Sequence, residues 1–271
     1  VMDPNSKTQR YYRDVVEQWG RLSGEQGNVL VYRGYNWNLA ENMLPYTKTR
    51  IWGEELPFYR KNGIVGLSVE ATKAWSINGA SDYVMMKLAW DTSRDWKQVL
   101  RTYCEKAFGS GAPAMERYYL RLAETQRSAG QEAGSYHAFH LIFDDTWAKA
   151  SQADIQKALR AAGSADDKTR IEYAASGVEA LRLYLAYHKA VQQFDFAAAK
   201  AGYDAMTAHW NKMYKVNSEL VANEVPAYLK RRSKRGLKEG QAKTRYLTEA
   251  EEAKLLAAAS AEPRQAMTLA L

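Results

Sequence analysis

Asn28-Val-Leu-Val-Tyr-Arg-Gly-Tyr35 and Ile64-Val-Gly-Leu-Ser-Val-Glu70 are two short apolar runs, and both end in polar or aromatic residues. Their β-branched and aromatic content predicts two strands. Between them the sequence predicts a polar loop and a helix that ends at Gly63, where a left-handed cap is expected. This order describes a βαβ unit with parallel strands. Because parallel strands place ligands at their carboxyl ends, we expect the functional residues to follow Tyr35 and Glu70.

The chain has 271 residues, of which 46% are hydrophobic and 25% charged, as in an ordinary globular protein of one or two domains. The patterning predicts an α/β part over 1–130, an α-helical domain over 131–225 and a basic, helical or flexible tail over 226–271. Two strands alone cannot make a stable α/β domain. Further strands are therefore expected from a missing amino-terminal portion or from a partner chain, and we favour the first because the chain begins with Val rather than Met.

Four helices are predicted from their apolar patterns. A helix over residues 6–19 is expected to place Tyr12, Trp19 and Leu22 on one face. The segment 82–90 is apolar nearly all round, which predicts a buried helix. In the carboxyl-terminal half, aromatic residues spaced by seven over 196–210 predict a helix that pairs with the helix over 171–188, as in a small bundle.

Several functional classes are disfavoured. The net charge is +7, but the basic cluster from Lys230 to Arg245 lacks interleaved aromatic residues, which is more typical of a solvated tail than of a nucleic-acid surface. No run approaches the ~18 apolar residues of a membrane span. The single cysteine, Cys104, lies on an apolar stripe and is expected in the core. His137 and His140 with Asp144 lack a closing ligand, so we expect no metal, and no cofactor motif is visible.

Glu70 is the predicted catalytic residue. A carboxylate at the end of an apolar strand is expected to face a cleft or a cation, where it acts as general acid or base or binds sugar hydroxyls. The structural alternative is a salt bridge to Lys73 or Arg33. Arg33 is a candidate for binding a uronate carboxylate in a bidentate way, or for pairing with Glu70 or Glu41.

The other candidates for substrate binding are polar or aromatic residues in or near the loops that follow the two strands. Trp and Tyr combine a flat apolar face with a polar group, which suits packing against sugar rings. They are Tyr35, Asn36, Trp37, Glu41, Trp52 and Trp75.

The stretches Gly63–Glu70, Lys87-Leu-Ala-Trp90-Asp91 and Cys104-Glu-Lys-Ala-Phe-Gly109 carry a resemblance to a known family. They resemble the carboxyl-terminal part of an uncharacterised carbohydrate-active family that is similar to the α-glucuronidase and β-hexosaminidase TIM-barrel glycoside hydrolases. The resemblance covers about residues 1–127 and weakens in the helical region. None of these stretches is a catalytic signature.

The resemblance implies the last two βα units of a (β/α)8 barrel, followed by an α-helical bundle. The loops after Tyr35 and Glu70 would form one wall of a glycan cleft, in a periplasmic or extracellular protein. The glycan would contain uronic acid or amino sugar and would be hydrolysed by carboxylates, of which one or both normally come from strands absent here. Two alternatives stay open: a non-catalytic glycan-binding or scaffold protein, and a basic helical protein that binds nucleic acid through residues 230–245.

Overall fold

The computed structural model describes residues 6–35, 43–70, 74–129 and 139–221. The chain divides into two compact units, Val1–Pro226 and Ala227–Leu271. The second unit, with the basic cluster from Lys230 to Arg245, lies outside the described residues. Everything below concerns the first unit.

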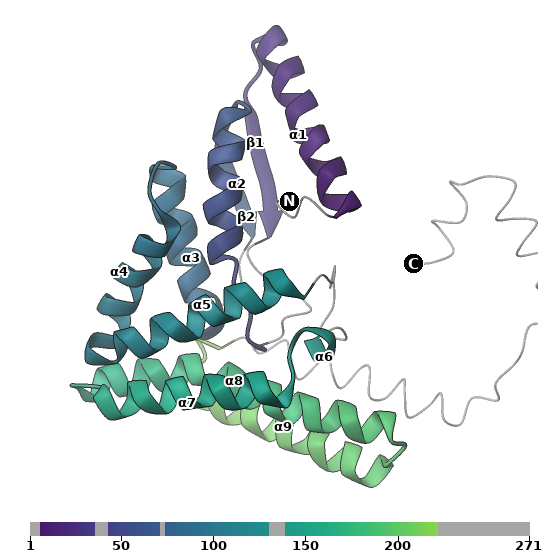
Figure 1. The fold of residues 1–271 in the computed structure, drawn as a ribbon, viewed down its shortest axis with the longest axis vertical. Coiled ribbons are helices and arrows are strands. Elements are labelled where there is room, and N and C mark those ends of the chain that lie inside the picture. Colours follow the sequence, from purple (N-terminus) through teal and green to yellow (C-terminus); the bar gives the residue numbers. More distant parts are fainter. Residues whose placement is uncertain (1–5, 36–42, 71–73, 130–138, 222–271) are drawn as a thin grey trace, which may run out of the picture. The chain divides into compact units, whose positions relative to one another are not determined.

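The amino-terminal part is the predicted βαβ unit preceded by a helix. Its elements are α1 (Lys7–Gln26), β1 (Leu30–Tyr35), α2 (Thr49–Lys61) and β2 (Ile64–Glu70). The two strands are parallel, and their register runs from Leu30 opposite Ile64 to Tyr35 opposite Glu70. Figure 1 shows α2 beside the strand pair. Two parallel strands are thus confirmed, and the described residues contain no closed barrel.

The ends of α1 follow from its sequence. Ser6 caps the helix, since its Oγ accepts a hydrogen bond from the backbone N–H of Gln9 at 3.2 Å. At the other end Gly27 adopts a φ of +67°, and its N–H bonds to the carbonyls of Ser23 and Gly24. The prediction that the helix ends at residue 19 was wrong, because Gly24 lies inside the helix and Gly27 provides the cap.

One face of the strand pair is covered by α2 and the other is open. On the covered face, Tyr32 stacks on Tyr59 with ring centroids 4.6 Å apart. On the opposite face, Val31 is 56% exposed, and Arg33, Ser68 and Glu70 are exposed as well. Parallel sheets are normally covered on both faces, so an open face with an exposed valine is unusual for this kind of sheet.

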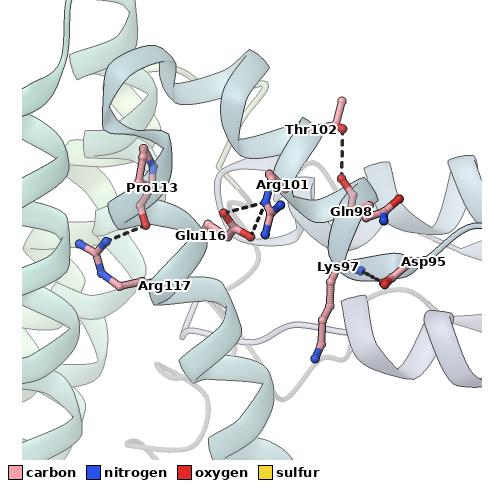
Figure 2. Close-up of polar contacts among 8 residues, drawn as sticks. All are labelled: Asp95, Lys97, Gln98, Arg101, Thr102, Pro113, Glu116 and Arg117. Atoms are coloured by element: carbon pink, nitrogen blue, oxygen red, sulfur yellow. Dashed lines mark hydrogen bonds and ion pairs between the residues drawn. The ribbon is translucent and has the colours of Figure 1, made fainter.

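A second layer consists of α3 (Trp75–Trp90), α4 (Trp96–Phe108) and α5 (Ala112–Ser128), with a 3-10 turn at Gly109–Gly111. Leu100, Cys104 and Met115 are fully buried between these helices, which confirms the core position of the cysteine. Figure 2 shows that the Arg101 guanidinium Nε bonds both Glu116 carboxylate oxygens, at 3.1 and 3.4 Å, which joins α4 to α5.

The remaining helices are α6 (Phe139–Ile142), α7 (Asp145–Ala161), α8 (Ala165–Gln192) and α9 (Phe196–Val216). In Figure 1 α7, α8 and α9 lie side by side, and α8 and α9 form the predicted two-helix hairpin. Met206 and Trp210 are buried in it, whereas Phe196, at the hairpin tip, is 70% exposed. The helices α5 and α3 contact α7 and α8, so residues on both sides of 130 share one unit.

The predicted helix over 82–90 is buried on one side only, and the face of α1 that carries Tyr12 and Trp19 is exposed. On α1, Tyr12 is 53% and Trp19 57% exposed, because no described element covers that face. On α3, Met86 is 52% and Trp90 91% exposed, because the neighbouring helices cover only the other side of this apolar helix. None of the described helices is long and apolar enough to cross a membrane.

Candidate functional site

The structure brings Arg33 and Glu70 together at the carboxyl ends of the two strands. The Arg33 Nη2 lies 2.8 Å from the Glu70 Oε2, and the side chains are 56% and 45% exposed. The Arg33 Nη1 also reaches the Ser68 carbonyl at 3.5 Å. The register explains this pair, because Arg33 lies opposite Ser68 and Glu70 follows two residues later on the same face. The predicted salt bridge between them is therefore formed, on the open face of the sheet.

Trp52 does not lie at this site. Its side chain is 2% exposed, and its ring packs edge-on against Tyr32 with centroids 6.4 Å apart. A tryptophan enclosed in this way has no free face for a sugar. Trp52 lies in the first turn of α2 and packs against the face of the sheet that α2 covers. This buried position does not fit the expectation that Trp52 binds substrate.

Trp75 remains available. It opens α3 shortly after the end of β2 and is 40% exposed. Gly79 lies one helical turn after Trp75, and a Cβ atom added there would lie 2.9 Å from the Trp75 ring. This glycine therefore makes room for the indole. Asn36, Trp37 and Glu41, together with Lys73 and the side chain of Tyr35, lie outside the described residues.

A buried polar cluster between the start of α2 and α3 was missed by the sequence reasoning. The Ser81 Oγ accepts a hydrogen bond from the backbone N–H of Lys48 at 2.9 Å. The Thr47 hydroxyl lies 3.1 Å from the Thr49 hydroxyl and 3.4 Å from that of Ser81. Asp82, beside Ser81, is 9% exposed. The signal was present, since the polar residues Ser81 and Asp82 directly precede the apolar run over 83–86.

The acid of this cluster has an altered affinity for protons. Burial raises the pKa of Asp82 to about 6, and the positive charge of Lys48 opposes the rise. A carboxyl group with such a pKa exchanges protons near neutral pH, as general acids and bases do. Asp82 is therefore a second acidic residue, besides Glu70, to be considered in the part of the chain that follows β1.

The raised pKa makes stability depend on pH. Between about pH 4 and pH 6 native Asp82 keeps its proton while the unfolded chain loses it, so the native state binds more protons. The free energy of unfolding therefore falls as the pH rises through this interval and stays lower above it. We expect Asp82→Asn to stabilise the protein by ~1–3 kcal/mol at pH 8 and to have little effect below pH 4.

Urea denaturation of both proteins at the two pH values measures this effect. Asp14→Asn, which alters an exposed carboxylate on α1, is the matched control. An equal stability difference between wild type and Asp82→Asn at both pH values would contradict the assignment.

A metal site is not formed by the described side chains. No group of three or more His, Cys, Asp or Glu among them could hold an ion. Asp144 instead caps α7, since its Oδ1 accepts a hydrogen bond from the Trp147 N–H at 2.7 Å. The His140 ring stacks on His188 with centroids 3.7 Å apart, and burial followed by the charge of His140 lowers the pKa of His188.

A second buried polar pair, Glu55 and Tyr59, belongs to α2 on the covered face of the sheet. The Tyr59 hydroxyl donates a hydrogen bond to the Glu55 Oε2 at 2.9 Å, and Glu55 is 5% exposed. Burial, with the negative charge of Glu55, raises the pKa of Tyr59. This pair fixes α2 against β1 through the Tyr32–Tyr59 stack, and we assign it a structural role.

Comparison with known proteins gives a match for the βαβ unit and the helices that follow it. No curated protein and no solved structure matches the chain significantly. Residues 2–120, which contain β1, β2 and the Arg33–Glu70 pair, match the family model described as Domain of unknown function (DUF4838).

Proposed function

We propose that this chain forms one wall of a glycan-binding site at the carboxyl ends of β1 and β2, within a glycoside hydrolase-like protein. The observation that supports it best is the exposed Arg33–Glu70 pair, in which Arg33 and Glu70 are joined at 2.8 Å on the open sheet face. A guanidinium binds the carboxylate of a uronic acid, and a carboxylate accepts hydrogen bonds from sugar hydroxyls. The nearby Trp75 offers an aromatic face for ring packing.

We also propose that β1 and β2 belong to a barrel that further strands complete. The face that carries Arg33 and Val31 is open, while parallel sheets are normally covered on both faces. The helix α1 lies next to α2, since the Arg13 guanidinium sits 4.7 Å from the Phe58 ring centroid. Successive βα units of a TIM barrel set their helices side by side in this way, outside the strands.

In this proposal Glu70 contributes to hydrolysis as one of the two carboxyl groups that most glycosidases use. Replacement of Glu70 by Gln in the complete protein is expected to lower turnover of a uronate-containing or N-acetylated glycoside at least ~100-fold, because the amide cannot exchange a proton. Glu179→Gln, which alters another exposed Arg–Glu pair, is the control. Unchanged turnover in Glu70→Gln would remove this residue from the mechanism.

A non-catalytic glycan-binding or scaffold protein is the alternative, and the pairing itself favours it. Arg33 already neutralises Glu70, an arrangement suited to binding hydroxyl groups. Measurable affinity for a glycan, without hydrolysis over a broad panel of glycosides, would support this alternative. The nucleic-acid hypothesis remains a prediction for residues 230–245, and it requires binding that weakens steeply with salt.

A further inference from the structure

A groove lies along α3 and the turn that follows it. It is lined by Tyr83, Met86, Lys87, Trp90 and Arg94 and holds about 570 Å³, within the usual ~300–1,000 Å³ of small-molecule sites. The spacing of these residues, at positions i, i+3, i+4, i+7 and i+11, makes one stripe that runs along the helix into the turn after it.

The groove is separate from the strand-end site. Trp75 opens α3 near the end of β2, and Trp90 closes the helix fifteen residues later. At the rise of an α-helix this separates the two tryptophans by about 22 Å. A ligand of one or two sugar rings that packs on Trp90 would therefore not reach Trp75.

The lining offers aromatic faces and positive charge together. Trp90 is 91% exposed, so its ring is available to a ligand. The Lys87 Nζ lies 5.6 Å from the Tyr83 ring centroid, and no described carboxylate lies within ion-pair distance of it. The Arg94 Nε bonds Asp91 at 3.2 Å, which leaves its two Nη groups without an acceptor among the described residues.

These features select the class of ligand. Aromatic rings pack against the apolar faces of sugars, and lysine and arginine bind carboxylate or sulfate groups. A protein partner would need about 20–30 residues on each side for a stable interface, far more than the five that line this groove. A nucleic-acid strand is usually bound along an extended positively charged groove, whereas this groove offers only the cations Lys87 and Arg94, with Asp91 and Asp95 close by in the chain.

We propose that this groove is a second binding site, for an acidic saccharide, with Trp90 as the stacking platform and Lys87 and Arg94 as the groups that bind its anion. The choice of a carbohydrate rests on the function proposed above, whereas the groove and its charge do not. The groove would hold one part of an acidic glycan while another part of the same glycan occupies the site at the strand ends.

The test is calorimetric titration of the full chain with trigalacturonate, and with cellotriose as the neutral probe. We expect trigalacturonate to bind at least ~10-fold more tightly than cellotriose, and Trp90→Ala and Lys87→Gln each to weaken it ~10-fold. Trp90→Phe should retain most of the affinity. Lys97→Gln, which removes a cation outside the groove, is the matched control. Since Trp90 and Lys87 are exposed, these variants should fold.

Three outcomes would overturn the proposal. The first is the absence of trigalacturonate binding. The second is binding that Arg33→Ala abolishes and Trp90→Ala leaves unchanged, which would support the strand-end site and reject the groove. The third is tighter binding of a short oligothymidylate that Trp90→Ala weakens, which would make the groove a nucleic-acid site. Conversely, loss of binding in Trp90→Ala with normal binding in Arg33→Ala would support the groove and count against the strand-end site.

Discussion

Replacement of Trp52 by Ala is expected to lower the free energy of unfolding by about 3–5 kcal/mol, the usual cost of removing a buried tryptophan. Trp52 is 2% exposed and joins α2 to the sheet through its edge-on contact with Tyr32. Its removal would leave a cavity between α2 and β1 that the Tyr32–Tyr59 stack cannot fill without moving. Chemical denaturation followed by circular dichroism measures the loss.

Trp90→Ala is the matched control for this prediction. Trp90 is 91% exposed, so its replacement should change stability by no more than ~0.5 kcal/mol. Equal losses in the two variants would mean that Trp52 is not part of the core. A stable Trp52→Ala that loses glycan affinity would instead restore the substrate-binding role that its burial argues against.

Replacement of Asp154 by Ala is the second large effect, expected to cost about 3 kcal/mol. The Asp154 side chain is 5% exposed on α7 and binds two cations of α5: Arg117, at 3.2 Å, and Arg121. The Arg121 Nη1 is buried and has no hydrogen-bond partner among the residues that the structure describes. Without Asp154 the Arg121 guanidinium, whose side chain is 30% exposed but whose Nη1 is buried, would lose its counter-charge. Removal of the buried Asp154 is therefore expected to cost more than the loss of an exposed pair.

The control is Asp204→Ala, which breaks the exposed pair of Asp204 with Lys200 on α9. Exposed pairs four residues apart on a helix contribute only ~0.3–0.5 kcal/mol, so this variant should remain close to wild type. Thermal unfolding of both variants at neutral pH makes the comparison. A wild-type stability in Asp154→Ala would show that α5 and α7 do not depend on this network.

The local parts of the fold could be predicted from the sequence because their causes are local. The two β-branched runs, the left-handed Gly63 with a φ of +79°, and the capping residue Ser6 each act within a few residues. The seven-residue spacing of aromatics likewise identified the α8–α9 hairpin.

The rest depends on contacts between distant segments. Apolar residues on α1 and at the end of α3 have the pattern of a core face, and nothing in the pattern tells whether a partner element covers it. The cluster of Thr47, Ser81 and Asp82 joins segments more than thirty residues apart. At the site, the pairing of Arg33 with Glu70 was one of the predicted alternatives, since the parallel register follows from the βαβ order. The burial of Trp52 was not predicted, because it depends on which face α2 presents.

The position of Cys104 makes the reactivity of its thiol a measure of how often the surrounding helical core opens. It is the only cysteine of the chain and is fully buried among α3, α4 and α5. Burial, with the nearby charges of Glu116 and Glu105, raises the pKa of its thiol, so the reactive thiolate is scarce while the core is closed. A thiol reagent therefore modifies only molecules in which this core has opened. The rate of labelling reads out the opening equilibrium of these helices without any engineered probe.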